Sequence, residues 1–166
     1  MKKGFSILIN TLNEGMNNLS HSVPVNFLRQ STDSFKLLGN VDVDFVVLKS
    51  GDKFLIEGTA RFTVEMNCAI CAEKFVKEYR EPFKLEFLHQ APIVSSKTWQ
   101  LSSDEVSRCY FQGEVLDLLP VLQDTILLAI PLAPACRAEC KGICPGCGMN
   151  LNLETCQCAK TATASH

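Results

Sequence analysis

The sequence lacks the signatures that usually identify an enzyme. Its 166 residues contain three histidines, and none of them lies beside a serine or cysteine in a nucleophile motif. There is no GxSxG elbow, no glycine-rich phosphate loop and no HExxH motif. We therefore expect no catalytic residues and no small-molecule substrate.

Clusters of positive charge are also missing. Lysine and arginine do not gather at any point of the sequence, and the net charge is −2 with a pI of about 5.9. Proteins that bind nucleic acid usually carry a basic face. Overall charge therefore does not favour direct RNA binding.

Export and membrane signals are absent as well. The apolar run Phe5–Ile9 ends at Asn10 and has no cleavage site after it. The longest apolar stretch, Val115–Ala135, contains two aspartates and three prolines, which makes it a poor membrane span. We expect a cytoplasmic protein without membrane contact. In a reducing cytosol, dense cysteine favours metal binding over disulfides.

Alternating apolar and polar residues predict a sheet. With 46% hydrophobic residues the chain can build a real core. Alternation over 41–47 and over 54–64, with a turn at 50–52, predicts a long hairpin. A third alternating run covers 75–87, so the CAIC sequence at 68–71 is expected to cap the next hairpin.

A helix is predicted after the sheet. Asp117 can act as its N-cap, Pro120 fits the first turn, and an apolar run leads to Pro131. Residues 13–22, rich in Asn, Ser and Gly, are expected to form a loop, and residues 110–115 a short strand.

These elements predict an α+β fold. An antiparallel β-sheet of long hairpins is covered by one C-terminal helix, and a small zinc-binding appendage follows. The expected division is an α+β core domain over 1–135, a cysteine-rich appendage over 136–158 and a flexible tail over 159–166.

Cysteine spacing is the most informative feature present. Eight of the nine cysteines form four close pairs: a first pair (Cys68, Cys71), a second (Cys136, Cys140), a third (Cys144, Cys147) and a fourth (Cys156, Cys158). Tetrahedral thiolate sites take two sulfurs from one tight turn and two from another. The pattern predicts two zinc ions with four thiolates each. Iron–sulfur clusters also use four thiolates and stay as an alternative.

The pairing between the sites follows from loop length. The third pair, in Cys144-Pro-Gly-Cys147-Gly148, resembles a zinc-ribbon knuckle, and the fourth pair returns after a short loop. One site can therefore close locally at low entropic cost. The first and second pairs would then join and tie the appendage to the hairpin. The alternative joins the first pair with the third. A closed four-thiolate site has no open coordination position, which favours a structural role.

Structural roles are also expected for four other residues. Cys109 is expected to be a small buried hydrophobe, and Asp42 and Asp44 to lie on a solvated strand face. Trp99 is expected to pack on the core, the alternative being an exposed platform for RNA bases.

The C-terminal half resembles a known family. The run DLLPVLQDTILLAIP over 117–131, CKGICPGCGMNLN over 140–152 and CQC over 156–158 are similar to the YceD family, large ribosomal RNA subunit accumulation proteins. The upstream CAIC also matches. The resemblance spans about 41–158. It implies a role in accumulation of 23S rRNA and in assembly of the large subunit, without established catalysis.

Partners and competing functions follow from this resemblance. It implies rRNA, a large-subunit ribosomal protein or an assembly particle as the partner, and the acidic net charge favours a protein contact over direct RNA binding. Thiolate density suggests a zinc- or redox-responsive regulatory protein as the alternative. A nuclease would need clustered carboxylates or a histidine base, and neither is present in the sequence.

Overall fold

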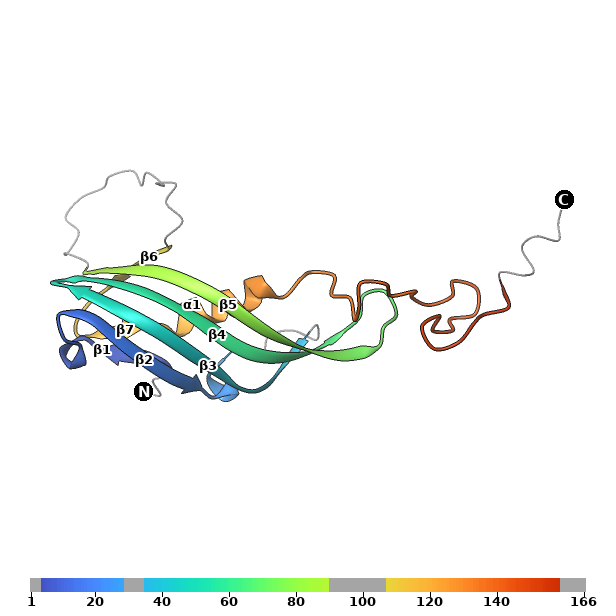
Figure 1. The fold of residues 1–166 in the computed structure, drawn as a ribbon, viewed down its shortest axis with the longest axis horizontal. Helices are drawn as coiled ribbons and strands as arrows, with labels where there is room; N and C mark the ends of the chain where they lie inside the picture. Colours follow the sequence, from blue (N-terminus) through green and yellow to red (C-terminus); the bar gives the residue numbers. More distant parts are fainter. Residues whose placement is uncertain (1–3, 29–34, 90–106, 159–166) are drawn as a thin grey trace.

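The computed structural model describes residues 4–28, 35–89 and 107–158 (Figure 1). In chain order the elements are β1 (Ser6–Leu8), η1 (Ile9–Thr11), β2 (Gly15–Val23), η2 (Val25–Phe27), β3 (Phe35–Ser50), β4 (Lys53–Asn67), β5 (Lys74–His89), β6 (Ser107–Phe111), β7 (Val115–Asp117) and α1 (Leu119–Ala129). Within these ranges no helix is long and apolar enough to cross a membrane. Trp99 lies outside the described residues.

The main sheet has five strands in the order β2-β3-β4-β5-β6. The first four pair antiparallel, and the β3–β4 and β4–β5 pairs are the two long hairpins that alternation predicted. β1 and β7 form a separate two-stranded ladder. The α+β fold is thus confirmed, with one difference: β6 runs parallel to β5. Parallel neighbours need a crossover of about a dozen residues or more, and residues 90–106 separate these two strands.

The core lies between one face of the sheet and α1. Val43 and Ala60 are register partners on that face, as are Val47 and Ile56, and all four are buried. Leu122 and Ile126 of α1 are buried in the same apolar cluster. In Figure 1 the helix lies behind the long strands. Each fully buried leucine or isoleucine contributes about 1.5–3 kcal/mol, so the apolar stripe of the helix holds it on the sheet.

The segment expected as a loop over 13–22 is largely strand, and that prediction was wrong. β2 pairs with β3 along its whole length, from Gly15 opposite Lys49 to Val23 opposite Val41. It is an edge strand with mostly exposed side chains, so it shows no apolar alternation. Backbone hydrogen bonds to β3 hold it in place, and the sequence pattern does not report those.

The helix begins later than the sequence suggested. Its N-cap is Leu118, and Asp117 belongs to β7, where it pairs with Ser6. The Asp117 carboxylate still accepts a hydrogen bond from the Leu119 amide, at 3.1 Å. Pro120 occupies the first turn, as predicted.

The outer face of the sheet is polar and largely paired. Ser22 Oγ donates to Asp42 at 2.7 Å, and Arg61 forms an ion pair with Asp44 at 2.7 Å. Exposed pairs of this kind contribute less than about 1 kcal/mol each. The two aspartates therefore lie on a solvated face, as predicted. Cys109 is half-buried on β6, and burial raises the pKa of its thiol.

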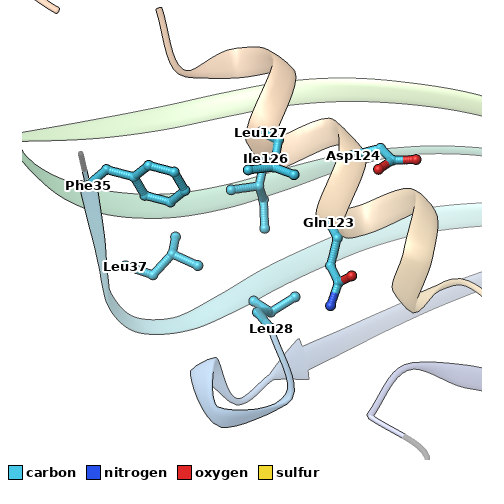
Figure 2. Close-up of a pocket in the computed structure, with 7 residues that line it drawn as sticks. All are labelled: Leu28, Phe35, Leu37, Gln123, Asp124, Ile126 and Leu127. Atoms are coloured by element: carbon cyan, nitrogen blue, oxygen red, sulfur yellow. The ribbon is translucent and has the colours of Figure 1, made fainter. Parts of the chain in front are cut away.

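One pocket of about 170 Å³ lies beside α1 (Figure 2). Its lining is mostly apolar and includes Leu28, Phe35 and Leu37. Asp124 is its single titratable side chain, and Gln123 donates to the Phe27 carbonyl at 3.5 Å. A lone carboxylate provides no acid–base pair. The candidate chemistry of the described residues therefore lies with the thiols.

Candidate metal centres

The structure gathers the eight paired cysteines into two groups of four. In each group the sulfur atoms all lie within 4.8 Å of one another. The anchored site, as we name it, combines the first and second pairs (Cys68, Cys71, Cys136, Cys140), and the local site combines the third and fourth (Cys144, Cys147, Cys156, Cys158). This is the grouping that loop length favoured, and the alternative grouping is not observed.

The spacing of the sulfur atoms in the anchored site fits tetrahedral coordination of a metal cation. Cys68 Sγ and Cys140 Sγ are 3.8 Å apart, and the Cys71–Cys136 separation is also 3.8 Å. A regular tetrahedron with metal–sulfur bonds of about 2.3 Å has sulfur–sulfur edges of about 3.8 Å. The local site is tighter: Cys156 Sγ lies 3.4 Å from Cys147 Sγ and 3.3 Å from Cys144 Sγ. Four thiolates are the donors that a soft divalent cation such as zinc prefers.

The first knuckle of the anchored site is the turn that joins β4 to β5. The Cys68 amide donates to the Glu73 carbonyl, and the Ala72 amide donates to the Cys68 carbonyl, both at 2.9 Å. Ala72 adopts a left-handed conformation with φ of 60°. The turn thereby presents two adjacent thiols at the end of the sheet.

The local site contains the same knuckle. The Cys144 amide donates to the Met149 carbonyl, and the Gly148 amide donates to the Cys144 carbonyl, both at 2.8 Å. Gly148 has φ of 73° and occupies the position that Ala72 holds in the first turn. The sequence indicates only this second knuckle, because glycine marks the left-handed position. In the first turn, alanine conceals it.

Amide donors stabilise thiolates in the anchored site. Burial opposes ionisation of Cys68, but the Cys136 amide at 3.3 Å and two amides of the turn lower its pKa to about 6. Burial also opposes ionisation of Cys140, yet the Asn152 side chain and the Gly142 amide lower its pKa. The Glu73 amide lowers the pKa of Cys71, but burial and the neighbouring sulfurs outweigh it and raise the pKa to about 12. The anchored site thus favours the thiolate forms of Cys68 and Cys140, and a bound cation would favour deprotonation of its other two cysteines.

The local site is polarised in the same way but is more open. The Cys147 amide and the Cys156 thiol lower the pKa of Cys144 to about 6. The Cys156 and Cys147 thiols, followed by burial, raise the pKa of Cys158 to about 12. Cys147 and Cys158 are exposed, whereas Cys68 and Cys71 retain only 2% and 4% of their accessible surface.

Hydrogen bonds and close packing also join the C-terminal segment to the β4–β5 turn. The Ala69 amide donates to the Pro134 carbonyl at 2.7 Å, and Asn150 Nδ2 donates to Glu73 at 3.3 Å. A Cβ on Gly142 would lie 3.1 Å from the Ile70 side chain, so the two backbones approach closely. Figure 1 shows this segment passing alongside the turn at one end of the sheet.

Comparisons with known proteins point to one family. The family model described as "Large ribosomal RNA subunit accumulation protein YceD" matches residues 56–165. Uncharacterized proteins of Mycobacterium bovis and Mycobacterium tuberculosis are 28% identical over 114 residues, which cover 69% of this chain and 53% of each relative.

A plant protein is also similar. The "Large ribosomal RNA subunit accumulation protein YCED homolog 1, chloroplastic" of Arabidopsis thaliana is 24% identical over 142 residues, covering 72% of this chain and 44% of the relative. The chain thus spans about half the length of the curated relatives it matches. No solved structure matches it at a significant level.

Proposed function

Because this chain belongs to the YceD family, we propose that it is a ribosome-biogenesis factor that supports accumulation of 23S rRNA and assembly of the large ribosomal subunit. The carrying observation is the family match over residues 56–165, which includes most of β4, all of β5 and α1, and all eight paired cysteines. The description of the Arabidopsis relative names large ribosomal RNA subunit accumulation for that protein.

The proposed cofactor is zinc, one ion in each site. The anchored site would be held by Cys68, Cys71, Cys136 and Cys140, and the local site by Cys144, Cys147, Cys156 and Cys158. Zinc in such a site supplies structural cross-linking, since four thiolates leave no open coordination position. We propose that residues 1–135 form the core and that 136–158 form an appendage fastened by the anchored site; the tail expected over 159–166 lies outside the described residues.

We propose that the protein acts by binding and not by catalysis. Its partner would be rRNA or a large-subunit ribosomal protein within an assembly particle. The net charge of −2 and the paired charges of the outer sheet face favour a protein contact. Ribosomal proteins are commonly basic, and a chain with a net charge of −2 would not repel them.

Depletion of the protein from its own cells tests the role. We expect the ratio of 23S to 16S rRNA to fall and immature large-subunit particles to appear on a sucrose gradient. Re-expression of the wild-type chain should restore the ratio, and tagged protein should sediment with precursor 23S rRNA at low salt. An unchanged ratio and an unchanged subunit profile would contradict the proposal.

One observation favours the regulatory alternative. Cys147 and Cys158 are exposed, so an oxidant could reach the local site first. A zinc- or redox-responsive protein should release zinc and change its partner binding under mild peroxide. If peroxide alters neither zinc content nor partner binding, this alternative fails.

A further inference from the structure

One side chain of the local-site loop contacts the anchored site. Asn152 belongs to the loop between Cys147 and Cys156, two cysteines of the local site. Its side chain nevertheless reaches the anchored site: Nδ2 lies 3.4 Å from Cys140 Sγ. Its Oδ1 accepts a hydrogen bond from the Lys141 amide at 2.9 Å. The amide group therefore holds Cys140 through its sulfur and through the backbone of the next residue.

Neighbouring bonds fix the orientation of this amide. Asn150 Oδ1 accepts from the Asn152 backbone amide at 3.0 Å and from Asn152 Nδ2 at 2.9 Å. Asn150 is in turn bonded to Glu73 in the β4–β5 turn. The Leu151 amide donates to the Gly142 carbonyl at 2.9 Å. The two bonds between Asn150 and Asn152 are partly buried, whereas the Asn150–Glu73 bond is exposed.

The other anchored-site cysteines have support that is independent of this loop. Cys68 and Cys71 lie in the turn that β4 and β5 hold from both sides. Cys136 donates its backbone amide to Cys68 Sγ. Cys140 lies in the irregular segment after α1, where its sulfur accepts a hydrogen bond from Asn152 Nδ2 of the local-site loop. Its position therefore depends most on the local-site loop.

We propose that Asn152 is a positioning residue that couples the two thiolate sites, so that closing the local site around a divalent cation orients Cys140 and tightens binding of a second cation at the anchored site. The inference rests on the proposed metal sites but not on the ribosomal role. Coupling between two binding equilibria is reciprocal, so each cation strengthens the other by the same factor. Loss of an outer-shell partner typically weakens metal affinity by about 10–100-fold.

Titration of the metal-free full chain with Co²⁺ tests the coupling, because tetrahedral thiolate coordination gives a visible spectrum. The wild type should bind two Co²⁺ ions cooperatively. Asn152→Ala should separate the two steps and weaken the anchored site by about 10–100-fold. Asn152→Asp keeps the acceptor for Lys141 but sets a negative charge against Cys140, so it should weaken the site at least as much. Asn18→Ala, an exposed asparagine on β2, is the matched control.

Variants that disable one site show where Asn152 acts. With the anchored site disabled by Cys71→Ser, Asn152→Ala should leave Co²⁺ affinity of the local site unchanged. With the local site disabled by Cys147→Ser, Asn152→Ala should weaken the anchored site much less than it does in the intact chain. Circular dichroism should show an intact sheet in every variant.

Three results would overturn the inference. The first is wild-type binding at two independent sites. The second is Asn152→Ala binding like the Asn18→Ala control. The third is equal weakening of the local site in the Cys71→Ser background, which would mean that Asn152 simply holds its own loop together. If the wild type binds no Co²⁺, the proposed metal sites fail and the coupling fails with them, whereas the ribosomal proposal is decided separately by rRNA levels.

Discussion

The anchored and local sites share one backbone knuckle in two different settings. Each knuckle has the same pair of hydrogen bonds and a left-handed residue directly after its second cysteine, Ala72 in one and Gly148 in the other. The anchored knuckle stands on two long paired strands, and both of its cysteines are buried. The local knuckle lies in an irregular segment, where Cys144 is buried but Cys147 is exposed, as is Cys158 of the same site. The same local geometry thus joins two distant segments of the chain in the anchored site, whereas in the local site it closes a single loop.

The setting decides what each site depends on. Strand pairing preforms the first knuckle, so a cation there only has to recruit the C-terminal segment. The local site lies in a segment with little secondary structure among its described residues, a single bridge between Ile143 and Asn150. Small metal modules of this kind draw much of their folding free energy from the cation. The two sites should therefore differ in how much of the chain each one stabilises, in how readily each loses its cation, and in how well each tolerates substitution.

The largest expected difference is in how much of the chain loosens when one site is disabled. Cys71→Ser should release the C-terminal segment from the sheet and speed hydrogen exchange at both the β4–β5 turn and residues 136–158. Cys147→Ser should speed exchange mainly within 144–158. Hydrogen exchange with mass spectrometry measures both. Equal spreading from the two variants would show that the sites are not distinct in this way.

The next difference is lability. A chelator or a thiol reagent should reach the local site first, because Cys147 and Cys158 are exposed whereas Cys68 and Cys71 are buried. Time-resolved alkylation read by peptide mass should show modification at 147 and 158 before 68 and 71. Earlier modification of the buried pair would contradict the burial seen here.

A third prediction concerns the close contact between the C-terminal segment and the β4–β5 turn. Gly142 has φ of 74°, and an added Cβ would lie 3.2 Å from the Ile70 carbonyl oxygen. Gly142→Ala should therefore incur left-handed strain of about 1–2 kcal/mol plus the cost of displacing the turn. Gly113→Ala is the control, since Gly113 has φ of 79° and open space around it. Only Gly142→Ala should weaken Co²⁺ binding at the anchored site.

The smallest prediction exchanges the two left-handed residues. Ala72→Gly removes backbone strain and should strengthen the anchored knuckle, while Gly148→Ala should weaken the local one, each by about 1–2 kcal/mol and without the added cost of displacing a neighbour. A Cβ on Gly148 has nothing within 4 Å, so strain alone decides its effect. Competition with a chromophoric chelator measures the two affinities. Changes of the same sign would mean that the knuckles are not equivalent.

Sequence patterns located much of the fold and of the thiol groups. The alternation over 41–47 and 54–64 predicted the first hairpin because a sheet with one buried face requires it. β2 escaped prediction because an edge strand needs no apolar face. Asn152 also escaped, since nothing in a loop asparagine indicates that its amide faces a cysteine of the other site.

The sequence by itself determined the thiol pairs, their knuckle spacing and the alternating strands, because each depends on residues only a few positions apart. The tertiary structure decided between the two groupings that the cysteine spacing allowed, placed β6 parallel to β5, and brought Asn152 of the local-site loop to Cys140 of the anchored site. Those contacts depend on where long strands end and on how α1 directs the chain past the β4–β5 turn. Distances between segments far apart in the chain arise from packing, and local spacing does not encode them.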